Sequence, residues 1–110
     1  MRSLIDGSPP RQTAPSLDRL RSRAPEMLEV CHRNGAFNVW VFGSIARGEQ
    51  GADSDLDLVV DFEKGRSLFD LAGLVDELES LLGCPVNVVT RSSLRDNTFG
   101  RTVRRDMVPL

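Results

Sequence analysis

The sequence contains few of the residues that mark secreted, membrane-spanning or metal-cluster proteins. Its 110 residues include two cysteines, one histidine, one tryptophan and no tyrosine. Cys31 and Cys84 lack the spacing of a metal site and lie in or beside apolar segments, so we expect two buried thiols in a reducing, cytoplasmic setting. No apolar run approaches the roughly 18 residues of a membrane span, and the first 15 residues lack the apolar core of a signal peptide. We therefore expect neither secretion nor a membrane location.

The charge balance excludes a general affinity for polyanions. Fourteen lysines and arginines face 16 aspartates and glutamates, which gives a formal net charge of −2. Aromatic residues are not interleaved with basic ones, so we expect no direct binding of nucleic acid. Arg101, Arg104 and Arg105 do form a local basic cluster near the end of the chain. We interpret it as a solvated surface, with contact to an acidic partner or RNA as the alternative.

The first part of the chain is predicted to be a tail, then helix, then strand. Residues 1–15 are rich in proline and small polar residues, so we expect a poorly ordered tail, with partner docking as the alternative. Apolar positions then recur at helical spacing from a cap at Ser16 to Cys31. Pro25 marks either a kink or the first turn of a second helix. The apolar run 39–42 predicts a buried strand.

The remaining patterns predict a small α/β (α+β) domain over residues 16–110. The expected elements are a brief helix at 45–47, an alternating strand at 55–62, a helix with an apolar stripe from Leu68 to Leu82, a strand at 86–89, and a last helix from Ser92 or Ser93 to about Asp106. Ser67 and Gly83 are the expected caps of the long helix. This order favours a mixed β-sheet of three or more strands, flanked by helices.

The turn after the first predicted strand has the character of a phosphate site. Gly43 and Ser44 lead from a strand into a short helix, where free backbone N–H groups and the helix dipole favour an anion. Arg47 adds a guanidinium that can hold a phosphate oxygen. A Gly-Ser turn is common, so this pattern alone is weak evidence.

Two carboxylates open the following strand. Asp55 and Asp57 are two positions apart, so their side chains point to the same face, about 6.7 Å apart along the strand. Carboxylates at that separation repel unless water screens them or a cation binds between them. Mg²⁺ or Mn²⁺ suits such hard oxygen ligands. The alternative is a solvated polar face, but a phosphate turn facing a carboxylate pair favours phosphoryl-type transfer.

These residues resemble the signature of a known family. The stretch from residue 41 to 65 reads VFGSIARGEQGADSDLDLVVDFEKG and is similar to that of the minimal nucleotidyltransferases, within the DNA polymerase beta-like superfamily. Its features are the Gly-Ser turn, an Arg-Gly pair and a Ser-Asp-x-Asp-Leu segment, and the likeness extends over about residues 17–110. The resemblance implies transfer of a nucleoside monophosphate from a triphosphate, with ATP as the expected substrate, to a hydroxyl group.

The family also implies residue roles and a partner. Carried over by position, Asp55 and Asp57 are the catalytic metal ligands, and Gly43, Ser44 and Arg47 hold the triphosphate. Many members of this size accompany a HEPN-type ribonuclease toxin, which the nucleotidyltransferase silences as its antitoxin by adenylylating a tyrosine or by binding.

One position departs from the family pattern. The third strand of the family usually carries an aspartate that completes the metal site, whereas this chain has Asn87. An amide oxygen can contact a divalent ion, but it has no charge and cannot accept the hydroxyl proton. Asp61 lies too far along its strand to replace it, and Asp53 belongs to the preceding loop. Two hypotheses therefore stand: an active, Mg²⁺-dependent adenylyltransferase, and a weakened or inactive domain that neutralises its toxin by binding.

Overall fold

A four-stranded mixed sheet forms the centre of the computed structural model, which describes residues 15–51 and 54–110. The strands are β1 (Ala36–Phe42), β2 (Leu56–Phe62), β3 (Val86–Thr90) and β4 (Val108–Pro109), in the order β3-β2-β1-β4. β1 runs antiparallel to both β2 and β4, whereas β2 and β3 are parallel. The predicted mixed sheet is therefore confirmed. The tail predicted at residues 1–15 lies outside the described residues except for Pro15, and so the predicted domain boundary stays a prediction.

Five helices surround this sheet in the described residues. They are α1 (Leu17–Ser22), α2 (Ala24–Arg33), α3 (Gly43–Arg47), α4 (Leu68–Leu82) and α5 (Thr98–Asp106). Ser16 caps α1 as predicted, because its hydroxyl accepts from the Arg19 backbone N–H at 3.2 Å. Pro25 stands in the first turn of a separate helix, which a proline tolerates, and so it begins α2 and does not kink one long helix. Among these helices, none has both the length and the apolar character to cross a bilayer.

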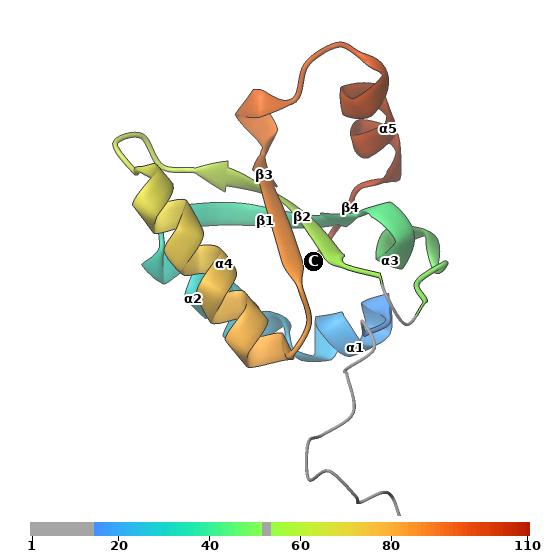
Figure 1. Cartoon of the computed structure of the whole chain (residues 1–110), viewed down its shortest axis with the longest axis horizontal. Helices are drawn as coiled ribbons and strands as arrows, with labels where there is room; N and C mark the ends of the chain where they lie inside the picture. The colour runs from blue at the N-terminus through green and yellow to red at the C-terminus, as the bar shows by residue number, and fades with distance from the viewer. Residues whose placement is uncertain (1–14, 52–53) are drawn as a thin grey trace, which may run out of the picture.

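A large apolar cluster covers one face of the sheet, and a small one covers the other. α2 and α4 lie side by side against one face, whereas α5 packs on the opposite face, near α3 (Figure 1). On β2, alternate residues Leu56, Leu58 and Val60 are buried under α2 and α4. Val59 points the other way and packs with Phe42 and with Val103 of α5. Because side chains alternate along a strand, Asp57 shares the face of Val59, which is the α5 face.

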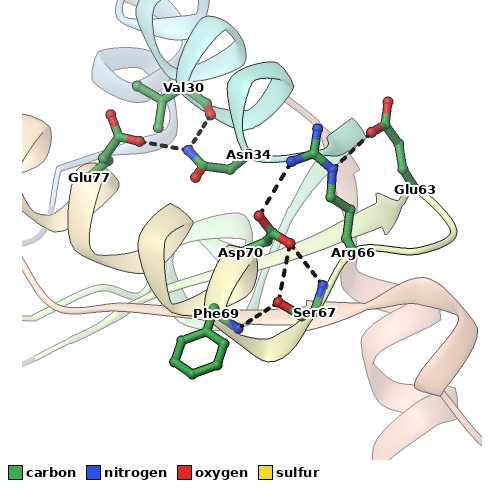
Figure 2. A network of polar contacts seen from close by, with 8 residues as sticks. All are labelled: Val30, Asn34, Glu63, Arg66, Ser67, Phe69, Asp70 and Glu77. Carbon is green, nitrogen blue, oxygen red and sulfur yellow. Dashed lines mark hydrogen bonds and ion pairs between the residues drawn. The ribbon is translucent and has the colours of Figure 1, made fainter.

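The start of α4 is fixed by polar contacts instead of core packing. Ser67 and Asp70 form a capping box, and Asp70 also accepts from Arg66, which donates in turn to Glu63 (Figure 2). Leu68, the first residue of the predicted apolar stripe, is 81% exposed in this first turn. Burial begins with the half-buried Leu71 one turn later.

The C-terminal segment differs most from the expectation. Ser92 and Ser93 belong to a short 3₁₀ turn (Arg91–Ser93), and α5 begins only at Thr98. Asn97 sets this start, because its side-chain oxygen accepts from the Gly100 N–H at 2.8 Å. The strand β4 was not predicted, since two residues that include a proline give no strand pattern. It is possible at an edge of the sheet, where a proline need not donate a ladder hydrogen bond.

Both cysteines are buried, as predicted, and this has a measurable consequence. Burial raises the pKa of the Cys31 thiol to about 11. We expect Cys31 of the folded protein to resist a disulfide reagent at pH 8 and to react when urea unfolds the chain, because the thiolate is the nucleophile. The extent of reaction is measured from the absorbance of the thiolate that the reagent releases. Stoichiometric reaction of Cys31 in the native state would contradict the burial described here.

Candidate functional site

Strand pairing brings the predicted site residues to one end of the sheet. Asp57 lies opposite Phe42 of β1 and opposite Asn87 of β3. Gly43 follows Phe42 directly, so the turn into α3 begins beside the carboxylate. The turn, the carboxylate pair and Asn87 come from three separate segments of the chain and meet on the α5 face of the sheet.

Asn87 donates hydrogen bonds to both members of the carboxylate pair. Its side-chain nitrogen donates to Asp55 Oδ2 at 3.2 Å and to Asp57 Oδ1 at 3.1 Å. An amide nitrogen has two hydrogens, which is enough for one hydrogen bond to each carboxylate. The amide group therefore links the two carboxylates that sequence spacing placed on one face.

Asp57 is the carboxylate whose protonation is most affected by the fold. Partial burial raises its pKa above the ordinary value of 3.8, and the negative charge of Asp55 raises the pKa further. The Asn87 hydrogen bond and the positive charge of Arg47 oppose this shift without cancelling it. The charged form of Asp57 is thus under-stabilised by the protein alone, which is the condition under which a carboxylate gains from a bound cation.

Gly43 is needed where it stands for two independent reasons. Its φ of +76° lies in the left-handed region that residues with a Cβ rarely adopt. In addition, a Cβ at this position would overlap Asp57 Oδ2 and lie 3.3 Å from Asp57 Cγ. The absence of a side chain is what allows the Asp57 carboxylate to lie directly against the turn.

We predict that Gly43→Ala displaces the Asp57 carboxylate and lowers any transfer activity about a hundredfold, as expected for a misplacement of roughly 1 Å. The obstructed atom ends a flexible side chain, so the domain should still fold. Gly65→Ala is the matched control, because Gly65 has a φ of +87° but nothing within 4 Å of the added Cβ. Activity per folded molecule, with folding checked by circular dichroism, decides the matter. Equal losses in the two variants would show that backbone strain alone is responsible.

A short helix does begin at the turn for which the sequence predicted a phosphate site. Helix α3 starts at Gly43, and Phe42 at its N-cap supplies no side-chain acceptor for the first N–H groups. Ser44 is half-buried in this first turn. Gly48 ends the helix in a left-handed conformation. Uncapped N–H groups at a helix start favour an anionic ligand.

Arg47 is held from two sides in a way that the sequence did not reveal. Its Nε donates to Glu49 Oε1 at 2.9 Å, and its Nη1 donates to Asp106 Oδ2 at 3.0 Å. The Asp106 side chain is only 10% exposed and also accepts from Arg105, which holds its pKa below the usual range. Asp106 belongs to α5, so it joins the C-terminal helix to the predicted phosphate-binding arginine. No local pattern could have paired residues 59 positions apart.

We predict that Asp106→Asn weakens triphosphate binding and leaves the chemical step nearly unchanged. With the Asp106 charge removed, Arg47 is oriented by Glu49 alone, and KM for the nucleotide should rise about fivefold, since a charge-assisted hydrogen bond fixes the guanidinium plane. Steady-state kinetics separate KM from kcat, and Asp106→Glu should restore part of the loss. An effect confined to kcat would contradict a positioning role.

Two carboxylates and one amide suit a hard divalent cation, but they lack the negative charge of a third carboxylate. Asp55 and Asp57 supply carboxylate oxygens, and Asn87 can supply an amide oxygen if its side chain turns over. Within residues 15–51 and 54–110, no third acidic, histidine or cysteine side chain joins them. Asp61 is engaged elsewhere, by Arg91 at 2.7 Å and by Asn38 at 2.9 Å. Asp53 lies outside the described residues. Two carboxylates leave room for the phosphate oxygens of a nucleotide as further ligands.

The chain is similar in sequence and in fold to known proteins. A family model described as "Nucleotidyltransferase domain" matches residues 27–108. A protein adenylyltransferase, MntA of Thermococcus cleftensis, is 44% identical over 80 residues, which cover 73% of this chain and 80% of that protein. A solved minimal nucleotidyltransferase superposes with a TM-score of 0.76 at 45% identity, over 90% of this chain and all of the other. A toxin–antitoxin crystal structure with AMP-PNP shares the fold, with a TM-score of 0.65 at 21% identity over 77% of this chain and 69% of that one.

The family model covers the turn at Gly43, both carboxylates and Asn87 in one continuous match, as well as the sheet that brings them together. The chain therefore belongs to the nucleotidyltransferase domain family.

Proposed function

We propose that this protein is a divalent-metal-dependent protein adenylyltransferase, the antitoxin of a HEPN-type toxin, which moves AMP from ATP to a hydroxyl group of that toxin. The observation that carries the proposal is the placement of Asp57 beside the glycine turn that begins α3, with Asp55 and Asp57 both bonded to Asn87. The 44% identical relative is named a protein adenylyltransferase, and one solved structure with the same fold is a toxin–antitoxin pair with a nucleotide analogue. Both support the proposal.

Each group has a distinct task in the proposed reaction. Asp55 and Asp57 would hold Mg²⁺ or Mn²⁺, which when bound neutralises charge on the phosphates. The N–H groups at the start of α3 and the Arg47 guanidinium would fix the triphosphate. A bond forms between the acceptor hydroxyl oxygen and the α-phosphorus, and the α–β phosphoanhydride bond breaks to release pyrophosphate. Asn87 cannot take the hydroxyl proton, so solvent or the partner must accept it.

A second candidate function is favoured by Asn87 itself. A domain that keeps the nucleotide site but lacks the third carboxylate could neutralise a toxin by covering its surface, without transferring AMP. Modification of a tyrosine of this chain itself is excluded, because the sequence contains none.

Intact-mass spectrometry separates the two functions. The product of the neighbouring gene, as the proposed toxin, is incubated with this protein, ATP and Mg²⁺, and its mass is measured. A gain of one or more AMP groups, absent with Asp57→Asn, supports the adenylyltransferase. No gain, together with a stable complex by size-exclusion chromatography, supports the binding antitoxin. If the partner is neither modified nor bound, both functions are contradicted.

A further inference from the structure

The Asn87 amide occupies the position that a shared cation would need. Its nitrogen contacts Oδ2 of Asp55 and Oδ1 of Asp57 at nearly equal distances, 3.2 and 3.1 Å. Both carboxylates therefore direct one oxygen at a single point. The other oxygen of Asp57, Oδ2, lies on the side of Gly43, where a Cβ would overlap it. The two oxygens of Asp57 therefore face different neighbours: Oδ1 faces Asn87, and Oδ2 faces Gly43.

Amide hydrogens and a cation compete for the same oxygens. The amide hydrogens carry partial positive charge and partly neutralise the two carboxylates, which would otherwise repel each other. A divalent ion placed between these oxygens would meet the hydrogens at close range, and the repulsion must be relieved. Relief requires the amide either to turn about its terminal bond, which presents its oxygen, or to swing away. An aspartate at this position would offer no hydrogens and would need no such movement.

We propose that the Asn87 side chain is an internal cap on the Asp55–Asp57 pair, which holds divalent cations off until the amide turns or withdraws. The inference rests on the proposed metal site and deepens it. A cation that arrives with a nucleotide brings phosphate oxygens and their charge, which compensate for the two hydrogen bonds lost. Cation and nucleotide binding are therefore strongly linked in this chain, and each raises the affinity of the other by the same factor.

The sharpest test measures Mn²⁺ binding to the full chain, without nucleotide, from the free-ion signal in electron paramagnetic resonance. Asn87→Ala should bind Mn²⁺ about tenfold more tightly than the parent, because no amide hydrogens remain to be displaced. The matched control is Asn38→Gly, which removes another exposed amide from a carboxylate on the same sheet, with glycine accepting the φ of +52°. Its Mn²⁺ affinity should equal that of the parent. Weaker or unchanged binding by Asn87→Ala would overturn the cap and assign Asn87 as a ligand or a bystander.

A second measurement needs no variant of the site. In nitrogen–proton correlation spectra of the parent, adding Mg²⁺ should shift the side-chain amide signals of Asn87 and leave those of Asn38 in place. An unshifted Asn87 signal at saturating Mg²⁺ would also overturn the cap. Both tests are independent of the proposed reaction, since metal affinity can be measured whether or not AMP is transferred. If mass spectrometry finds no transfer while Asn87→Ala tightens Mn²⁺ binding, the proposed function fails and the cap stands.

Discussion

Replacing Asp57 with asparagine is expected to abolish nucleotidyl transfer and, at the same time, to stabilise the folded domain at neutral pH. The loss follows because Asp57 is the central carboxylate of the proposed metal site, and a metal acting on phosphate oxygens supplies several kcal/mol. That energy corresponds to a decrease of roughly a thousandfold or more. Transfer of radiolabelled AMP to the partner protein measures it, and residual activity above a tenth would remove Asp57 from the site.

The gain in stability depends on pH, and its sign follows from the raised pKa of Asp57. The folded state binds this proton more tightly than the unfolded chain, whose aspartates titrate near 3.8. The stabilisation that this tighter proton binding gives to the folded state is present in full below that pH, and it is lost as pH rises through the folded-state pKa of Asp57. At pH 7 the charged Asp57 therefore destabilises the fold, and Asp57→Asn removes this penalty. We expect the free energy of unfolding of the variant to exceed that of the parent at pH 7, with the difference shrinking toward pH 3.8.

Urea denaturation at several pH values checks this expectation. Asp61→Asn is a suitable control, because Asp61 lies on the same face of β2 but pairs with Arg91 at 2.7 Å. Its replacement removes an attractive pair and should give no stabilisation at pH 7. A stability difference for Asp57→Asn that grows as the pH is lowered would contradict the assigned direction of the shift.

The second large expected effect is a gain in transfer activity. Asn87→Asp should increase transfer about ten- to a hundredfold, because a third carboxylate adds a charged metal ligand and a group able to accept the hydroxyl proton. Initial rates at saturating Mg²⁺ measure the gain. Asn87→Ala separates the causes, since it removes the amide hydrogens without supplying a base, and it should raise metal affinity with little gain in rate. No change in a measurable rate for Asn87→Asp would refute the assignment of this position.

Asn87→Asp should also make the melting temperature of the domain depend on Mg²⁺. Asp57 and Asp55 would face a third negative charge at the place where Asn87 now donates at 3.1 and 3.2 Å. Without Mg²⁺ the variant should melt below the parent, because three adjacent carboxylates repel one another. With Mg²⁺ it should gain more in melting temperature than the parent does, since binding to the folded state alone stabilises it.

Local chemistry made much of the fold predictable. The caps at Ser16, Ser67 and Gly83 lie where the sequence placed them, because hydroxyl acceptors and left-handed glycines act within a few residues. The period-two spacing of Asp55 and Asp57 likewise put both carboxylates at one end of β2. These features need no knowledge of the rest of the chain.

Features set by distant parts of the chain could not be predicted. The strand β4 exists because β1 offers an open edge, and its own two residues carry no strand pattern. The contact of Arg47 with Asp106 depends on how α5 docks against α3. The direction of the Asn87 amide depends on the register of β2 with β3, which the order of residues alone does not give.

Since the site is assembled across such distances, its presence can serve as a report on folding. Asp57 and its Asn87 partner are 30 positions apart, and Arg47 and Asp106 are 59 apart. A peptide cut to span residues 43–57 would contain the turn and both carboxylates, yet neither the amide that links them nor the helix that holds the arginine. The proposed linkage between nucleotide and metal binding would therefore be a property of the whole folded domain, and it would offer a quality control for each preparation that does not require the partner protein.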